Sequence, residues 1–133
     1  SVAFKETQIL NDDSSNQMRG FAVSSGRITA KASVILGPTD FDKMENGSIL
    51  VSPMTTPAWT QLFASAVGLV TDMGSILAHG SIVAREYGIP AVLGVGNGTK
   101  RIRHGQMLTI DGDAGIVVIH KETDESIPAS GDA

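Results

Sequence analysis

The fold is decided by a stretch in the middle of the chain, residues 66–93, which reads AVGLVT DMGSILA HGSIVAREYG IPAVL. The apolar run at residues 66–71 predicts a buried strand, and residues 72–78, which contain a glycine, predict a loop. A helix is predicted to begin at residue 79, and the apolar run at 89–93 predicts a further short strand. This stretch is therefore expected to form a strand–helix–strand unit.

The helix in this unit has recognisable ends. Its apolar side chains Ile82, Val83 and Tyr87 are expected to face inward. Gly88 is expected to stop the helix at the C′ position, where glycine adopts the left-handed conformation without steric cost. His79 stands at the opposite end, in the first turn.

The preceding part of the chain is predicted to be rich in strands. Residues 20–36 predict two short strands around a turn at 24–26, and the second strand, 27–35, is the stronger because it is mostly alternating and β-branched. The Asn-Gly pair at 46–47 marks a turn, and residues 48–51 predict a short apolar strand.

A second helix is predicted to begin just after this strand. Thr56 is expected to be its N-cap and Pro57 its first helical residue. Trp59, Leu62 and Phe63 follow at a spacing that places them on one buried face.

The chain is expected to close with a β-hairpin. An Asp-Gly pair within the turn at 111–115 is flanked by β-branched strands at 107–110 and 116–119. The glycine-rich stretch 94–100 is interpreted as a flexible turn. Because β-rich ends bracket a central β-α-β-α-β stretch, the predicted fold class is α/β, with sheet layers and helices packed on one side.

Composition limits the classes of protein that fit. The chain has 133 residues, of which 41% are hydrophobic and 18% charged, as expected for one globular domain. A net charge of −4 without a long basic stretch argues against a nucleic-acid partner. The chain has no cysteine, and no apolar run approaches the length of a membrane span. Since no signal-peptide pattern opens the chain, the predicted location is cytoplasmic.

The polar ends predict a division into three parts. Residues 1–19 are expected to be a linker-like segment, residues 20–120 the domain, and residues 121–133 a flexible tail. Such ends favour a domain that belongs to a longer polypeptide.

His79 is the main candidate for a functional residue. Its predicted place at a helix N-terminus offers backbone N–H groups and a partial positive charge, which attract phosphate. That environment disfavours a protonated imidazole, and a neutral ring is a nucleophile toward phosphorus. The small neighbours Ala78, Gly80 and Ser81 leave the ring open to a large reactant. The alternative is a structural or merely exposed histidine, which is the commoner case for a lone residue.

Other residues near His79 are candidates for supporting roles. Thr71 and Asp72 end the strand below the loop, where they either orient the imidazole by a hydrogen bond or cap the strand. Arg85 is expected to anchor the loop before His79; the alternative is an exposed pair with Glu86.

The remaining candidates do not form a site. His104 and His120 have no further His, Cys or carboxylate at metal-ligand spacing, so both are interpreted as solvated and no metal site is predicted. The stretch 94–100 is similar to a phosphate-binding loop at first sight, but its glycine spacing fits neither nucleotide-binding pattern.

The region around His79 closely resembles a known family. Residues 71–94 are similar to the phosphohistidine, or swivelling, domain of phosphoenolpyruvate-utilising enzymes such as phosphoenolpyruvate synthase and pyruvate phosphate dikinase. The resemblance continues in residues 20–26, 49–59 and 105–115, and together it covers about residues 20–119. Within this family, the pattern around His79 is nearer to the rifampicin-phosphotransferase branch than to the pyruvate dikinases.

The resemblance implies a swivelling β/β/α fold in which His79 is phosphorylated. His79 would accept a phosphoryl group from ATP or phosphoenolpyruvate at one active site and deliver it to an acceptor at another. The implied partners are an ATP-grasp nucleotide-binding domain, which would hold Mg²⁺ and ATP, and an acceptor-substrate domain. No cofactor is expected in this domain itself.

Two departures from the family pattern concern the loop before His79. The family usually has paired glycines there, whereas here Gly74 is followed by Ser75. Leu77 and Ala78 occupy the places where several members carry Thr or Ser, one of them a regulatory phosphorylation site. The missing glycine supports an alternative, a non-catalytic regulatory or docking module that retains the fold.

Overall fold

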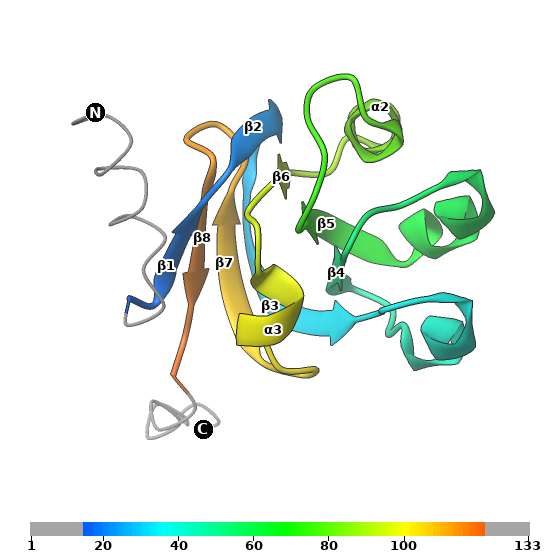
Figure 1. Ribbon diagram of the computed structural model, residues 1–133, viewed down its shortest axis with the longest axis horizontal. Helices are drawn as coiled ribbons and strands as arrows, with labels where there is room; N and C mark the ends of the chain where they lie inside the picture. The colour runs from blue at the N-terminus through cyan, green and yellow to red at the C-terminus, as the bar shows by residue number, and fades with distance from the viewer. Residues whose placement is uncertain (1–14, 122–133) are drawn as a thin grey trace.

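The computed structural model describes residues 15–121, and its elements follow one another from β1 to β8 (Figure 1). In chain order they are β1 (Gln17–Arg19), β2 (Phe21–Ser24), β3 (Arg27–Val34), η1 (Pro38–Lys43), β4 (Ser48–Ser52), η2 (Pro57–Ala64), β5 (Ala66–Thr71), α2 (His79–Tyr87), β6 (Ala91–Leu93), α3 (Gly98–Arg101), β7 (Met107–Asp111) and β8 (Ile116–Ile119).

The strands form one sheet in the order β1-β8-β7-β3-β4-β5-β6-β2. Strand β3 belongs to both halves of this sheet: Arg27–Lys31 pairs antiparallel with β7, and Ala32–Val34 pairs parallel with β4. Strands β4, β5 and β6 continue the parallel half. The long strand β3 therefore connects a parallel half to an antiparallel half.

Alternating side chains divide this structure into layers. In β4 and β5, Ile49, Val51 and Val70 contact one core cluster together with residues of β1, β7 and β8, whereas Leu50 and Leu69 contact a second cluster with residues of η2 and α2. Successive side chains of a strand point to opposite faces, so each buried strand contributes to both cores. The result is a β/β/α arrangement with η2 and α2 on one side of the parallel half (Figure 1), and the predicted fold class is confirmed.

A bent N-terminal strand closes the sheet on itself. Only Gly20 separates β1, which pairs with β8, from β2, which pairs with β6. Figure 1 shows β1 and β2 as one continuous ribbon that passes from the antiparallel half of the sheet to the parallel half. A Cβ atom on Gly20 would lie 2.5 Å from the carbonyl oxygen of Leu93, so this crossing requires glycine.

The predicted boundary of the domain at residue 20 is wrong. Strand β1 lies within the predicted linker-like segment 1–19, and the side chain of Met18 is fully buried in the core between the two sheet halves. The polar residues around this short strand concealed it in the sequence. Residues 1–14 and 122–133 lie outside the described residues.

The predicted helices are present, with corrections. The first is a 3₁₀ helix, η2, which buries Trp59, Leu62 and Phe63 as predicted. In α2 the inward prediction holds for Val83 but is wrong for Ile82 and Tyr87, whose exposed fractions are 47% and 46%.

The geometry of α2 explains both errors. Its buried stripe consists of Gly80, Val83 and Ala84, with Ser81 also buried, and Ile82 lies on the opposite side of the helix axis from this stripe. Tyr87 continues the stripe by one turn but stands at the helix end, where its ring contacts Phe63 at a centroid distance of 5.9 Å.

The stretch 94–100, predicted to be a flexible turn, contains the start of the short helix α3. This helix contacts β4 and β5, and Ile102 directly after it is buried in the core between the sheet halves. The glycines that suggested flexibility in fact permit a tight approach: a Cβ atom on Gly98 would lie 3.2 Å from Oδ1 of Asp72.

The role of β1 can be tested by truncating Met18. Met18→Ala is expected to lower the free energy of unfolding by about 2–5 kcal/mol, because it leaves a cavity between the sheet halves. The matched control is Met107→Ala, because the side chain of Met107 is 40% exposed. This variant is expected to lower the free energy of unfolding by less than about 1 kcal/mol. Urea unfolding followed by tryptophan fluorescence measures both; equal losses would show that β1 is not part of the core.

Candidate functional site

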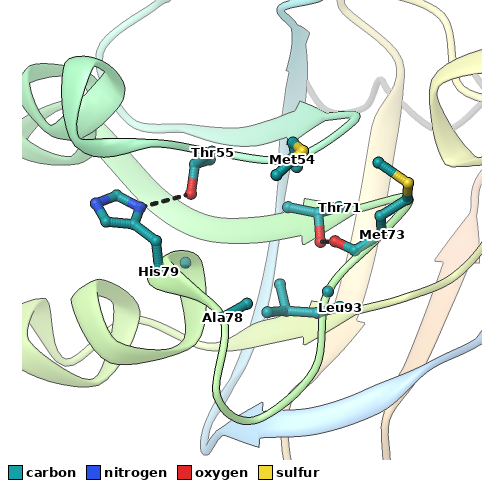
Figure 2. Close-up of a pocket in the computed structure, with 9 residues that line it drawn as sticks. Met54, Thr55, Thr71, Met73, Ala78, His79 and Leu93 are labelled. Atoms are coloured by element: carbon teal, nitrogen blue, oxygen red, sulfur yellow. Dashed lines mark hydrogen bonds between the residues drawn. The ribbon is translucent and has the colours of Figure 1, made fainter.

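The candidate site lies at the carboxyl ends of the parallel strands β4, β5 and β6, an edge at which ligands commonly bind in α/β sheets. The loops that follow these strands and the start of α2 surround a pocket of about 180 Å³ (Figure 2). It is lined by Met54, Thr55, Thr71, Met73, Gly74, Ala78, His79, Gly80 and Leu93. The histidine selected from the sequence is therefore part of a formed depression in the surface.

His79 is the first residue of α2, as predicted. Ala78 precedes it as the N-cap in an extended conformation, and no side chain caps the helix. The imidazole itself is half-buried. The ring thus stands at a helix N-terminus, where the helix dipole favours negative charge.

Two hydroxyl groups contact the two nitrogens of this ring. Oγ1 of Thr55 lies 2.9 Å from Nδ1, and Oγ1 of Thr60 lies 3.4 Å from Nε2. The ring also lies in a T-shaped arrangement with Phe63, with 6.4 Å between ring centroids and an interplanar angle of 81°. Figure 2 shows the imidazole turned toward Thr55, on the strand β4 side of the pocket.

Gly80 makes the contact between Thr55 and His79 possible. Thr55 is buried in the loop after β4, and α2 must begin close to it for the two side chains to meet. A Cβ atom on Gly80 would lie 3.1 Å from Oγ1 of Thr55 and 3.0 Å from Cδ2 of Leu69. Larger residues at this position would therefore push the helix start away from the sheet.

The loop before His79 is held by backbone contacts. Gly74 has a φ of +130°, which is strained for residues other than glycine. A Cβ atom on Gly94 would lie 2.8 Å from the carbonyl oxygen of Gly74, so the loops after β5 and β6 pack closely together. One glycine in the loop therefore suffices for this conformation, and Ser75 occupies the second position of the family pattern.

Thr71 and Asp72 make the contacts of strand-end capping, one of the two roles considered for them. Oγ1 of Thr71 donates a hydrogen bond to the carbonyl oxygen of Met73 (2.6 Å). The carboxylate of Asp72 accepts hydrogen bonds from the backbone N–H (3.0 Å) and the hydroxyl (2.6 Å) of Thr99. These two residues fix the loop and the start of α3, while the imidazole is oriented by other groups.

Arg85 anchors an element other than the predicted one. Its Nη1 donates to the hydroxyl of Ser81 (2.6 Å) and to the carbonyl oxygen of Val23 (3.3 Å). The prediction that it anchors the loop before His79 is therefore wrong, because the side chain extends toward β2 and ties the helix to the sheet. Ser81, fully buried, takes part in this same connection.

Thr55 and Thr60 are residues of the site that sequence reasoning missed. From the sequence, Thr55-Thr56-Pro57 is assigned to a helix start and to a segment that resembles the family, with no role toward His79, and Thr60 is assigned no role. A signal for Thr55 is present in the sequence: it follows a strand of the predicted β-α-β-α-β stretch by a few residues, and the loops after parallel strands gather at one edge of a sheet. Thr60 could be found only once the position of η2 relative to α2 was known.

The other histidines lie away from this site. His104 is exposed, and its Nδ1 accepts a hydrogen bond from the backbone N–H of Val34 (3.1 Å). The prediction of a solvated His120 is wrong: it is half-buried, and its Nε2 lies 2.7 Å from Oγ1 of Thr109 on the neighbouring strand.

Between residues 15 and 121, no three side chains among His, Asp and Glu gather in a way that could hold a metal ion. In the same part of the chain, no helix has the length and apolar character needed to cross a membrane.

The fold and the site together define a β/β/α domain that presents a hydroxyl-supported histidine at the start of a helix. Residues 44–115, more than half of the chain, match the family model of the mobile domain of PEP-utilising enzymes. The chain therefore belongs to this family of mobile domains, which are parts of PEP-utilising phosphotransferases.

Similar proteins are much longer than this chain. Over 100 residues it is 49% identical to rifampicin phosphotransferase of Bacillus subtilis (strain 168), a match that covers 75% of this chain and 11% of the relative. Over 101 residues it is 43% identical to phosphoenolpyruvate synthase of Aeropyrum pernix, which covers 75% of this chain and 12% of that relative. The chain thus spans a small part of the length of either enzyme.

Solved structures share the fold. A solution NMR structure of an Enzyme I protein aligns with a TM-score of 0.54 at 30% identity, covering 68% of this chain and 38% of that chain. The crystal structure of aconitase X from Thermococcus kodakaraensis aligns with a TM-score of 0.59 at 18% identity, covering 79% and 98%. The second likeness concerns the fold alone.

The orienting role of Thr55 can be tested by Thr55→Val, which removes the hydroxyl at Nδ1 and keeps the side-chain volume. The nitrogen chemical shifts of the His79 ring are expected to move in NMR spectra, and the free energy of unfolding is expected to fall by about 1 kcal/mol. Thr56→Val is the matched control, since this exposed neighbour makes no side-chain capping bond.

The variant Asp72→Ala tests whether Asp72 stabilises the fold without orienting the His79 ring. It is expected to destabilise the fold by about 1–2 kcal/mol, through loss of its hydrogen bonds to Thr99, while the ring signals of His79 stay in place. If the ring signals move in Asp72→Ala and not in Thr55→Val, then Asp72, and not Thr55, orients the imidazole.

Proposed function

We propose that this domain carries a phosphoryl group on His79, which accepts it from ATP or phosphoenolpyruvate at one active site and delivers it to an acceptor at another. The observation that carries the proposal is the placement of His79 at an uncapped helix N-terminus, with Nδ1 held by Thr55 and the ring beside an open pocket. Membership in the mobile-domain family supports the same reading.

Nε2 is the nitrogen that attacks in this proposal. Nδ1 lies 2.9 Å from the buried hydroxyl of Thr55, whereas the contact of Nε2 with the half-buried Thr60 is longer, at 3.4 Å. A neutral ring that keeps its proton on Nδ1 has its lone pair on Nε2. The N–P bond forms as the bond from phosphorus to the leaving oxygen breaks, and that oxygen takes the electron pair.

Charge on the phosphoryl oxygens is stabilised from two directions in this mechanism. The N-terminus of α2 supplies its dipole from within the chain. Magnesium and nucleotide are held by an ATP-grasp partner domain, and a further domain of the same or a partner polypeptide holds the acceptor. Such a division fits the small share of its relatives' length that this chain covers.

The surface around His79 suits a site that closes against another domain. Its large exposed side chains are apolar, and residues 73–84 contain no charged side chain. The exposed members are Met54, Met73, Ile76, Leu77 and Ile82. Contact with a partner across such a surface excludes water, which protects a phosphohistidine from hydrolysis during transfer.

Labelling tests the proposal. With an ATP-grasp partner and ATP labelled at the transferred phosphate, the wild-type domain is expected to acquire an acid-labile, alkali-stable label, and His79→Ala is expected to abolish it. His104→Ala, which changes an exposed histidine elsewhere, is expected to keep the label. Label that survives in His79→Ala would refute the assignment, and a wild-type domain that stays unlabelled beside an active partner would favour a non-catalytic docking module.

The apolar surface predicts a separate effect on docking. Leu77, which is 85% exposed, is expected to be covered in the transfer complex, so Leu77→Gln should lower kcat/KM for phosphoryl transfer about tenfold or more. The matched control is Leu36→Gln, a 58% exposed leucine just after β3, which should leave the rate unchanged. Equal rates for both variants in a steady-state assay would exclude Leu77 from the contact.

A further inference from the structure

Thr60 lies on the opposite side of the His79 ring from Thr55. It is a half-buried residue of η2, and its Oγ1 is 3.4 Å from Nε2. Phe63 follows three residues later on the same helix and forms a T-shaped pair with the imidazole. In a 3₁₀ helix, side chains three residues apart lie on one face, so η2 presents both residues to the imidazole together.

The hydrogens of this cluster can be arranged in two ways. A neutral imidazole has one N–H and one lone pair, whereas each threonine hydroxyl can either donate or accept. If Nδ1–H donates to Thr55, the hydroxyl of Thr60 must donate to Nε2. If instead Nε2–H donates to Thr60, the lone pair lies on Nδ1 against the buried Thr55, where it has no access to phosphorus.

Resting on the proposed function, we propose that Thr60 is a positioning residue that selects the reactive form of His79 and then stabilises the phosphorylated ring. In the resting domain its hydroxyl donates to Nε2 and so holds the proton on Nδ1. When the N–P bond forms at Nε2, the hydroxyl loses this acceptor, turns aside by rotation about the Cα–Cβ bond of Thr60, and donates to a phosphoryl oxygen.

The length of the contact suits this exchange. At 3.4 Å, the hydrogen bond from Thr60 to Nε2 is weak compared with the 2.9 Å bond from Thr55 to Nδ1. Attack on phosphorus therefore breaks a weak bond and gains a stronger one to a charged oxygen. Arg85 is engaged elsewhere, on Ser81 and Val23, so the hydroxyl of Thr60 is the side-chain donor that the structure places at Nε2.

The 133-residue chain can test this without a partner domain. Potassium phosphoramidate is a small phosphoryl donor: Nε2 attacks its phosphorus, the phosphoramidate N–P bond breaks, and ammonia leaves. Thr60→Val is expected to slow phosphorylation of His79 about tenfold and to shorten the lifetime of the phosphohistidine, measured by ³¹P NMR. Thr60→Ser, which restores the hydroxyl, is expected to recover the wild-type behaviour, and Thr56→Val serves as the matched control.

The ring signals give a readout that a merely structural role would not move. Long-range ¹⁵N NMR is expected to show the Nδ1–H tautomer in the wild type and in Thr60→Ser, and an increased share of the Nε2–H tautomer in Thr60→Val. An unchanged tautomer and phosphorylation rate in Thr60→Val, or a Thr60→Ser variant as slow as Thr60→Val, would overturn the proposal. If phosphoramidate does not label the wild type, the tautomer alone decides the role of Thr60, whereas failure of transfer from an ATP-grasp partner would concern only the proposed function.

Discussion

The hydrogen bond between Oγ1 of Thr55 and Nδ1 of His79 is the contact on which the rest of the site depends. It joins the loop after β4 to the first residue of α2, 24 positions along the chain. The parallel pairing of β4 with β5 brings the two ends together, and Gly80 leaves the space in which they meet. The position of the His79 ring is therefore determined by how closely the backbone at the start of α2 approaches the loop after β4.

The same principle governs the wider fold. Gly20 lets one strand cross from the antiparallel half of the sheet to the parallel half, close to the carbonyl oxygen of Leu93 at the end of β6. Gly94, the next residue, meets the loop that leads to His79. Because these close approaches follow one another along a single edge, closure of the sheet and placement of the loop are parts of one packed arrangement.

Sequence patterns predicted what local periodicity determines. Strand β5 and helix α2 have the predicted bounds, since an apolar run, a helix start and Gly88 are all local signals. The position of β1 could not be predicted from the local sequence, because a three-residue strand among polar neighbours gains its stability from β8, a hundred residues away. The exposed Ile82 shows that a pattern of apolar residues predicts the presence of a helix more reliably than it predicts which face of the helix is buried.

For the candidate site too, the sequence predicted some residues and left others out. His79 was identified from its place at a helix start and from the surrounding motif. Its partners Thr55 and Thr60 were not, because hydroxyl residues are common and their contacts with the ring depend on how η2 packs against α2. Asp72 and Arg85 were candidates because of their places near His79 in the sequence, yet both side chains hold elements of the fold together.

An imidazole held at Nδ1 by a short hydrogen bond and at Nε2 only by a longer one suits the proposed carrier, which would react in two places. If the same Nε2 atom is to enter two active sites, its orientation relative to the domain has to be constant, because each site can then be reached by rigid movement of the whole domain. The bond to Thr55 provides that constancy. The uncharged surface of residues 73–84 adds the complementary property, since a surface without charge has no strong electrostatic preference for either partner. A carrier that bound one partner tightly would be slow to leave it, so a stretch without charged side chains at residues 73–84 fits the proposed transfer between two sites.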